Sequence, residues 1–331
     1  MKKLADLSAM IEEGLQSLVY PTSASTLYDP IRYTLESGGK RLRPMLVLMA
    51  ANLYTEDIQT ALKPALGIEM YHNFTLLHDD VMDKAPTRRG RPTVHVKWND
   101  NQAILSGDAM EGLAYRLIAE APSRVLKNVL DIFNQMNQEI CQGQQYDMEF
   151  ETRDDVTIEE YIEMIRLKTS VLLGRALQIG AYIGQDKQYG NLTDIGVNRY
   201  EWLDRDIETL LQFGTSIGLA FQLQDDWLDC WGDPETFGKR IGGDILENKK
   251  TFLRITALAN APEPNTEGMS EQQKIETFKN YYKKTGAEKA CRLAIANYHQ
   301  EALQALLKMS MPQLKLRHLK EIAEKLKKRN K

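Results

Sequence analysis

Cysteine is scarce in this chain of 331 residues, because only Cys141, Cys230 and Cys291 occur, far apart and in no CxxC pair. A disulfide framework or a thiolate zinc site is therefore not expected. The longest apolar run, residues 45–51, is far shorter than the roughly 20 residues that a membrane-spanning helix needs. Acidic residues near the start interrupt any apolar segment of the kind found in signal peptides. We expect a soluble protein in a reducing cytoplasm.

A strong excess of charge of either sign is also missing. The formal net charge is −4 and the isoelectric point is near 5.9. No overall positive field favours nucleic acid as a partner, so any anion must bind at a local basic cluster. The chain is long enough, at 43% hydrophobic residues, to bury a large core in one large domain or two ordinary ones.

Clean alternation of polar and apolar residues is scarce, whereas helical spacing is common. Apolar residues recur at intervals of three and four in two series: Leu46, Met49, Leu53, and Leu66, Met70, Phe74, Leu77. This period indicates helices and argues against a Rossmann or barrel fold. Thr157 and Glu160 form a capping-box pattern that predicts a helix start. A second helix is expected to begin near Glu208 and to end at residues 232–234.

Two stretches lack this periodicity, residues 84–101 and 259–270. The second contains proline, glycine and polar residues and is expected to be a surface loop. The first contains Arg88, Arg89 and Arg91 beside a glycine and a proline. Because loops of this length inside a compact chain are often functional, we expect these arginines to serve a site.

Two aspartate motifs of the form DDxxD interrupt this helical background. The first occupies residues 79–83 and the second residues 225–229. On a helix, residues four apart share one face, so Asp79 and Asp83 project together, and so do Asp225 and Asp229. Like charges at this spacing repel each other, which predicts a bound counter-cation.

Magnesium is the cation that these carboxylates predict. Mg²⁺ prefers oxygen ligands and usually keeps waters or substrate phosphates in its coordination shell. A diphosphate would supply the missing oxygens, and basic side chains would neutralise its remaining charge. Five local basic clusters meet this requirement: residues 40–43, 88–89, 168, 239 and 249–250.

The motifs also follow one another in a specific order. Between Gly38 and Thr251 the chain contains GGKRLRP, LLHDDVMD, RRGRPT, SGD, KTS, FQLQDD, GK and GGDILENKKT. This ordered set resembles the trans polyprenyl diphosphate synthase family, which includes farnesyl and geranylgeranyl diphosphate synthases. The resemblance implies one all-α catalytic domain over residues 1–331, with antiparallel helices around a deep cavity. It also implies that the two aspartate motifs face each other at the cavity mouth, and that the protein is a homodimer.

The resemblance assigns roles to individual residues. The main Mg²⁺ ligands would be Asp79, Asp83 and Asp225, supported by Asp80, Asp226 and Asp229. Isopentenyl diphosphate would be held by Lys40, Arg43, His72 and Arg89. The allylic diphosphate would be held by Arg88, Lys168, Lys239 and Lys249. The reacting centre would be lined by Thr169 and Gln222.

The implied reaction is a head-to-tail condensation. Three Mg²⁺ ions and the basic residues would stabilise the diphosphate as it leaves the allylic substrate. The double bond of isopentenyl diphosphate would attack the allylic cation, and proton loss would give a trans-prenyl diphosphate longer by five carbons. The released diphosphate is the expected base. Water would quench the cation, so the cavity walls below the metals are expected to be apolar.

Product length is expected to depend on the residues before the first motif. In the family, a bulky residue five positions before the first aspartate is associated with short products, and Phe74 occupies that position. Tyr71 and Thr75 belong to the same floor. We expect a product of fifteen or twenty carbons, with twenty favoured. A product of thirty carbons or more, as for a quinone side chain, is the alternative if neighbouring helices open the floor further.

Other functions fit less of the sequence. A terpene cyclase normally pairs one aspartate motif with an Asn/Ser/Glu motif and lacks GGKR. A non-catalytic subunit of a heteromeric synthase tends to lose motif aspartates, and none is missing here. A helical Ca²⁺-binding scaffold leaves the basic clusters unexplained. The basic stretch at residues 314–331 is expected to be a solvated helix, with peripheral membrane contact as the alternative.

Overall fold

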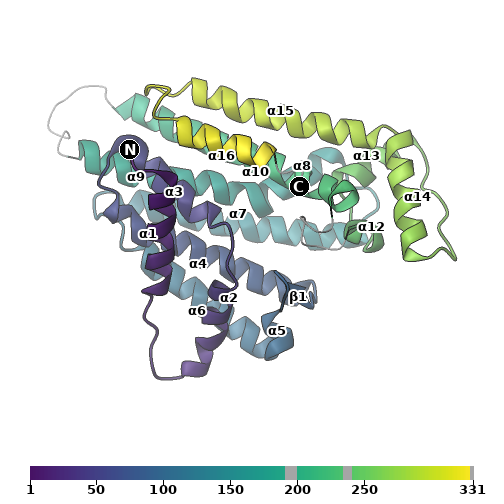
Figure 1. Ribbon diagram of the computed structural model, residues 1–331, viewed down its shortest axis with the longest axis horizontal. Coiled ribbons are helices and arrows are strands. Elements are labelled where there is room, and N and C mark those ends of the chain that lie inside the picture. Colours follow the sequence, from purple (N-terminus) through teal and green to yellow (C-terminus); the bar gives the residue numbers. More distant parts are fainter. Residues whose placement is uncertain (191–199, 234–240, 329–331) are drawn as a thin grey trace. The chain divides into compact units, whose positions relative to one another are not determined.

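The computed structural model describes residues 1–190, 200–233 and 241–328, and the regular secondary structure of these residues is almost wholly helical (Figure 1). The chain forms two compact units. Unit 1 comprises Met1–Phe133 and Ala176–Ile207, and unit 2 comprises Asn134–Arg175 and Glu208–Lys331. Three helices have residues in both units: α7 (Leu126–Thr152), α9 (Val171–Tyr189) and α10 (Tyr200–Trp231).

Unit 1 is built around α4 (Gln59–Met82), the helix that carries the first aspartate motif. α4 packs against α1 (Leu4–Gln16), α3 (Leu42–Tyr54) and α6 (Asp100–Ile118). The remaining elements are η1 (Ser25–Leu27), α2 (Asp29–Glu36), β1 (Thr87–Arg88), β2 (Arg91–Pro92) and α5 (Val94–Lys97).

The centre of unit 1 explains why α3 has no polar face. Every residue from Pro44 to Tyr54 is buried, as expected for a helix that is apolar on all sides. α9 crosses α3 closely at Gly180, where a Cβ atom would lie 2.8 Å from the carbonyl carbon of Val47. Full burial of each large apolar side chain contributes about 1.5–3 kcal/mol, so this dense core holds the helix of the first motif in place.

The sequence indicated an irregular segment in the arginine-rich stretch before α6, but part of this stretch has regular structure. β1 and β2 form an antiparallel hairpin in which Arg88 pairs with Arg91. Arg89 and Gly90 make the two-residue turn, with φ of 53° and 73°. Positive φ at both turn residues is the geometry that suits the twist of a hairpin. Strands of two residues are too short to produce a visible alternation in the sequence.

Unit 2 contains the second aspartate motif at the end of α10. Its other elements are α8 (Ile158–Ile165), η2 (Arg166–Ser170), α12 (Gly243–Leu246), α13 (Phe252–Asn260), α14 (Glu271–Lys284), α15 (Ala287–Leu307) and α16 (Arg317–Lys327). Its apolar core joins residues of α8, α10, α13, α14 and α15. Figure 1 shows α16 alongside α15, and these helices are in contact. The apolar side of α16 is used in this packing, since Leu319, Ala323 and Leu326 are buried.

Two helix boundaries test the sequence predictions. Thr157 is the N-cap of α8 and forms a capping box with Glu160, as predicted. The prediction that the second-motif helix begins near Glu208 is wrong, because α10 begins at Tyr200. Leu203 and Ile207 are buried and continue the helical spacing through a stretch whose many charges had concealed it.

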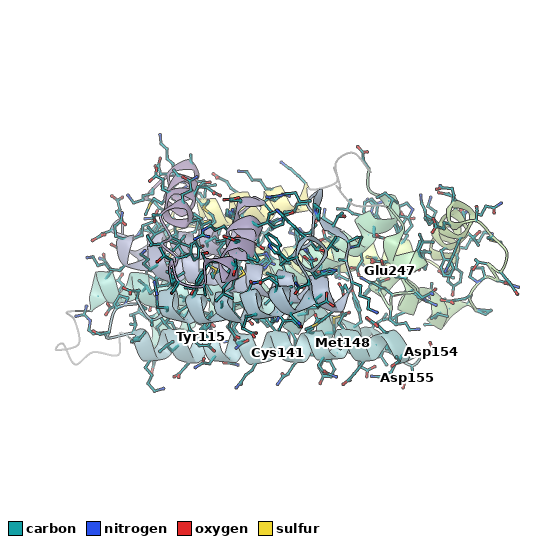
Figure 2. All side chains as sticks on the ribbon, turned by 90° about the horizontal axis from the view of Figure 1, so that it is seen from below. Tyr115, Cys141, Met148, Asp154, Asp155 and Glu247 are labelled. Carbon is teal, nitrogen blue, oxygen red and sulfur yellow. The ribbon has the colours of Figure 1, made fainter. Side chains whose placement is uncertain are left out.

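The three cysteines are free thiols, and all of them belong to unit 2. Cys230 and Cys291 are buried, whereas Cys141 is exposed on α7, along which Met148 also lies (Figure 2). Within the described ranges, no helix has both the length and the apolar character needed to cross a membrane.

Candidate active site

The first aspartate motif lies at the carboxyl end of α4, where Asp83 is the C-cap residue. Carboxylates are disfavoured there by the negative end of the helix dipole, so a cation is needed. Arg88 supplies one: its Nε donates to Asp80 Oδ1 at 2.8 Å, and its Nη2 lies 3.6 Å from Asp79 Oδ2. Burial raises the pKa of Asp80, and the Arg88 guanidinium opposes that rise.

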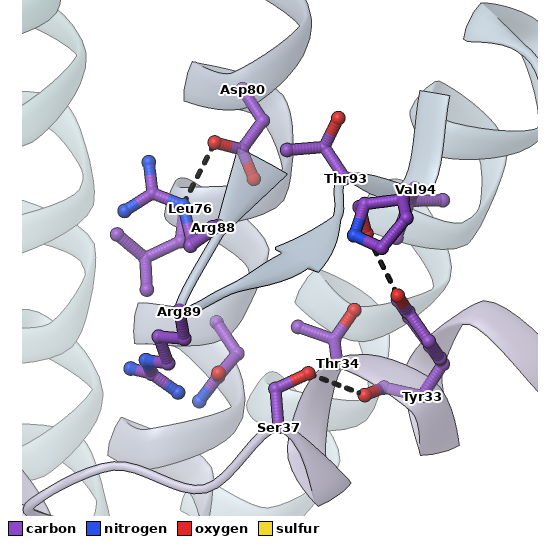
Figure 3. A pocket seen from close by; sticks show the side chains of 11 residues that line it. Tyr33, Thr34, Ser37, Leu76, Asp80, Arg88, Arg89, Thr93 and Val94 are labelled. Carbon is purple, nitrogen blue, oxygen red and sulfur yellow. Dashed lines mark hydrogen bonds and ion pairs between the residues drawn. The ribbon is translucent and has the colours of Figure 1, made fainter. Parts of the chain in front are cut away.

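A pocket lies on the side of α4 that carries Asn73, Leu76 and Asp80 (Figure 3). It has a volume of about 340 Å³ including its mouth, and residues of α2 and the β1–β2 hairpin complete its wall. Both hairpin arginines, Arg88 and Arg89, line it. The hairpin thus brings two predicted diphosphate ligands to the motif helix within unit 1.

Arg43 and His72 contact each other, as expected if both serve one anion site. Arg43 Nη1 lies 3.0 Å from His72 Nε2. Burial lowers the pKa of His72 well below its usual range, and the positive charge of Arg43 lowers it further. The ring is therefore neutral and Nε2 accepts from Arg43. Burial also lowers the pKa of Arg43 to about 10, which leaves its charge intact at neutral pH. In this geometry His72 orients Arg43.

A buried ion pair beneath this site was not anticipated from the sequence. Arg41 Nη1 donates to Glu69 at 2.9 Å, its Nε donates to Glu12 at 3.0 Å, and its Nη2 donates to the Leu35 carbonyl at 2.6 Å. Asn73 also donates to Glu69. Removing one member of such a pair leaves an uncompensated buried charge. Arg41 thus ties α1, α2 and α4 together directly beside Arg43.

The two glycines of GGKRLRP have a steric explanation. Gly38 and Gly39 both have positive φ, and a Cβ atom at Gly39 would lie 3.0 Å from the Arg89 guanidinium. Arg89 donates through Nη1 to the Gly38 carbonyl. The close approach lets the loop before α3 hold Arg89, while Lys40 is exposed on the same loop.

The predicted floor residues do not play equal parts. Phe74 is partly exposed and makes edge-on ring contacts with Tyr71 and His78, at centroid distances of 5.4 and 4.8 Å. Tyr71 is fully buried and packs on Phe133 at 5.2 Å. The Thr75 hydroxyl donates to the His72 carbonyl. The Phe74 ring is therefore partly accessible, and the buried Tyr71 ring packs against it.

The second motif is arranged differently. Asp225 is half-buried, whereas Asp226 and Asp229 are buried. Asp229 accepts a hydrogen bond from the Asp244 backbone N–H at 3.2 Å. Burial raises the pKa of Asp226 to about 8, and the charge of Asp244 adds to the rise. The three carboxylates of the second motif therefore differ in burial and in the groups that surround them.

Lys168 and Thr169 lie on η2, a π-helical turn between α8 and α9. Such turns are uncommon and frequently occur at functional sites. Lys168 Nζ donates to Asp147 on α7 at 2.6 Å. α7 can approach the turn because Gly143 has no side chain: a Cβ atom there would lie 2.7 Å from Lys168 Cα.

Thr169 meets the second-motif helix through Gln222. The Thr169 hydroxyl donates to Gln222 Oε1 at 3.3 Å, and Gln222 Nε2 donates to Asp226 Oδ1 at 3.2 Å. Tyr161 on α8 completes the chain, since its hydroxyl donates to Asp226 Oδ2. The pair Thr169 and Gln222 was predicted. Tyr161 was missed, because in the sequence it is one more large residue on an apolar helix face.

Lys249, another predicted ligand of the allylic diphosphate, lies just after α12. Lys249 is exposed and lies 3.3 Å from Glu247. Its backbone N–H donates to the Asp244 carbonyl at 2.9 Å. Lys239 lies outside the described residues.

These donor sets suit Mg²⁺. Each motif offers carboxylate oxygens at a helix end, which are the hard ligands that Mg²⁺ prefers. In the described part of the chain, no group of three or more His, Cys, Asp or Glu side chains is gathered closely enough to hold a metal ion without further ligands. Open pairs of carboxylates fit an ion that keeps waters and substrate phosphates as ligands. The metal and substrate roles of the individual side chains remain predictions.

The helical fold and the two aspartate motifs define the class of isoprenoid diphosphate synthases. Residues 24–287 match the family model for polyprenyl synthetase, and the chain belongs to this family. It is 37% identical over 278 residues to the geranylgeranyl diphosphate synthase of Methanosarcina mazei, with 83% of this chain and 81% of that protein covered.

Solved structures agree with the helical fold. The crystal structure of a geranylgeranyl pyrophosphate synthase has a TM-score of 0.88 and 43% identity, and 98% of both chains is covered. The geranylgeranyl pyrophosphate synthetase of Pyrococcus horikoshii has a TM-score of 0.85 and 32% identity, with 98% of this chain and 97% of that chain covered. The predictions of family and of an all-α fold are confirmed.

Proposed function

We propose that this trans-prenyltransferase joins isopentenyl diphosphate to allylic diphosphates and makes geranylgeranyl diphosphate, with twenty carbons, as its main product. The observation that carries the proposal is that the family match contains every aspartate of both motifs and the basic residues that accompany them. Relatives named for a twenty-carbon product support this product length.

In the proposed mechanism, bound Mg²⁺ supplies Lewis acidity that helps the allylic diphosphate to leave. The carboxylates of Asp79, Asp83 and Asp225 would hold the metal. Arg88, Lys168, Lys239 and Lys249 would bind the allylic diphosphate and stabilise its charge. Lys40, Arg89 and Arg43, which His72 orients, would position isopentenyl diphosphate.

The residues around the reacting carbon act on the cation. Thr169 and Gln222 present oxygen dipoles, which stabilise positive charge without acting as nucleophiles. Phe74 presents an aromatic ring on the motif helix, on the side where the growing chain is expected. Its ring would stop elongation after the product reaches twenty carbons, and apolar neighbours would exclude water from the cation.

The test is incubation of purified protein with Mg²⁺, labelled isopentenyl diphosphate and either dimethylallyl, geranyl or farnesyl diphosphate, followed by separation of products by chain length. We expect twenty-carbon product from each primer. Phe74→Ala should lengthen the product by one or more five-carbon units. Tyr71→Phe is the matched control, because it keeps the supporting ring and should leave the length unchanged. Products of thirty carbons or more from the unmodified protein would refute Phe74 as the floor.

We also propose that the protein is a homodimer. Ile104 and Leu105 on α6 are 45% and 57% exposed, which is high for adjacent large apolar residues. Burial of this pair against a second copy would stabilise a dimer. Sedimentation equilibrium should give twice the chain mass, and Leu105→Glu should shift the protein toward monomer. A monomeric unmodified protein would contradict this proposal.

The three free thiols support a reducing compartment, which we propose is the cytoplasm.

A further inference from the structure

A chain of hydrogen bonds in unit 2 joins a tyrosine of unassigned role to the predicted reacting centre. Tyr161 on α8 donates to Asp226 Oδ2, Asp226 Oδ1 accepts from Gln222 Nε2, and Gln222 Oε1 accepts from the Thr169 hydroxyl. Tyr161 is 3% exposed and Asp226 is 4% exposed, so solvent does not replace these partners easily. Gln222 and Asp226 are four residues apart on α10 and therefore share one face.

This series of hydrogen bonds fixes the orientation of the Gln222 side-chain amide. Because the Tyr161 hydroxyl lies against Oδ2, a proton shared at Asp226 belongs on that side. Oδ1 is then an acceptor whether the carboxyl group is charged or neutral. An acceptor at Oδ1 requires the NH₂ end of Gln222, so the amide oxygen must face Thr169. A flipped amide would place its oxygen against Asp226 Oδ1 and lose that hydrogen bond, although its NH₂ group could still donate to the Thr169 hydroxyl.

We propose that Tyr161 and Asp226 are positioning residues that hold the Gln222 oxygen toward the allylic cation. This inference rests on the proposed function. The amide oxygen carries partial negative charge, whereas a flipped amide would present its positive NH₂ end to a developing cation. Electrostatic stabilisation depends on dipoles that are oriented before the reaction begins. Both carboxylate oxygens of Asp226 face protein donors, so its role is to hold Gln222, and metal binding is left to Asp225 and Asp229.

Three variants distinguish this role from metal binding: Tyr161→Phe, Asp226→Asn and, for comparison, Asp225→Asn. Asp226→Asn is isosteric, but its amide can present either its oxygen or its NH₂ group to Gln222, so it no longer fixes the direction of the Gln222 amide. We expect it to lower kcat by about 100-fold, the effect of one misdirected electrostatic group. The KM for the allylic diphosphate and the Mg²⁺ concentration for half-maximal rate should change less than about threefold. Asp225→Asn should raise that Mg²⁺ concentration instead.

Tyr161→Phe should lower kcat by about tenfold, which is the factor for a lost hydrogen bond of about 1.4 kcal/mol. The double variant Tyr161→Phe/Asp226→Asn should be no slower than Asp226→Asn alone within about threefold, because both act through Gln222. Circular dichroism and urea unfolding identify variants that fail to fold, and Asp226→Asn then carries the test alone.

Several results would overturn the inference. If Asp226→Asn raised the Mg²⁺ requirement as Asp225→Asn does, Asp226 would be a metal ligand. If Tyr161→Phe retained full kcat, or if the two substitutions were additive, the hydrogen-bond chain would not position Gln222. In these cases the unmodified protein still makes prenyl diphosphate, and the proposed function stands. An inactive unmodified protein overturns the proposed function and this inference together.

Discussion

Replacing Gly143 by alanine should displace the π-helical turn that carries Lys168 and Thr169. A Cβ atom at Gly143 would lie 2.7 Å from Leu167 C and Lys168 Cα, and closer still to the Lys168 amide nitrogen. Ordinary van der Waals contact begins at 3.4 Å, so α7 and the turn must separate by at least 0.7 Å. The turn also packs closely on α10, where a Cβ atom at Gly218 would lie 2.6 Å from Ser170 Cα. Its backbone is therefore not free to move without cost.

A displacement of this size has two measurable effects. Misplacement of reacting groups by ~1 Å lowers catalysis by about 100-fold. Overpacking of a close helix contact lowers the free energy of unfolding by about 1–3 kcal/mol. Steady-state kinetics with an allylic diphosphate should therefore show kcat/KM reduced by about 100-fold for Gly143→Ala. Urea unfolding of the same protein should show the stability loss.

Gly112→Ala is the matched control for this substitution. Gly112 is an exposed glycine on α6 with no atom within 4 Å of the Cβ position. Alanine is favoured over glycine in a helix by about 1 kcal/mol, so the control should be slightly more stable and fully active. If Gly143→Ala matched the unmodified protein in activity and stability, the turn would yield without cost. The argument that glycine packing positions Lys168 and Thr169 would then be wrong.

Three further predictions concern unit 1. Glu69→Gln should lower the free energy of unfolding in urea by about 3–5 kcal/mol, because it removes the buried charge partner of Arg41 and leaves only the exposed Glu12; a loss below ~1 kcal/mol would show that the pair is not buried in solution. The lowered pKa of His72 means that the unfolded chain binds one more proton than the folded protein below about pH 6.5. The free energy of unfolding should therefore fall by about 1.4 kcal/mol for each pH unit below that point, and His72→Gln should remove this share of the slope in a pH series. Arg88→Gln should raise the affinity of the diphosphate-free protein for Mn²⁺ about fivefold, measured by electron paramagnetic resonance, because a competing cation worth ~1 kcal/mol leaves Asp79 and Asp80. Unchanged or weaker Mn²⁺ binding would contradict that competition.

Local patterns predicted much of the fold and the positions of both motifs. Helical spacing indicated the all-α class, and the Thr157 capping box marked the true start of α8. These signals lie within a few residues of each other, and a sequence displays them directly. The hairpin at Arg88 was missed because its strands are only two residues long.

The connections between elements could not be predicted in this way. Tyr161 and Asp226 are 65 positions apart, and Arg41 and Glu69 are 28 positions apart. A buried polar residue must find a partner, but the sequence does not say which partner the packing brings near. The sequence therefore assigned no role to Tyr161, and it placed Arg41 only in a basic cluster. The motif residues are close together in the sequence and could be recognised there. The residues that support the site reach it only through contacts between distant segments, which the sequence does not display.

Strained backbone marks the loops that carry the predicted diphosphate ligands. Of the five non-glycine residues with positive φ in the described ranges, all but Ala24 lie at these loops: Arg41, Lys84, Arg89 and Asn248. A residue held in such a sparsely populated conformation costs about 1–3 kcal/mol. Arg41 and Lys84 directly follow predicted site residues, Arg89 is itself a predicted site residue, and Asn248 directly precedes one. Arg41 keeps its conformation through three hydrogen bonds, to Glu12, Glu69 and the Leu35 carbonyl. The buried network of unit 1 thus offsets local strain and holds the basic loops in a fixed geometry before any anion arrives, which reduces the entropy lost on binding.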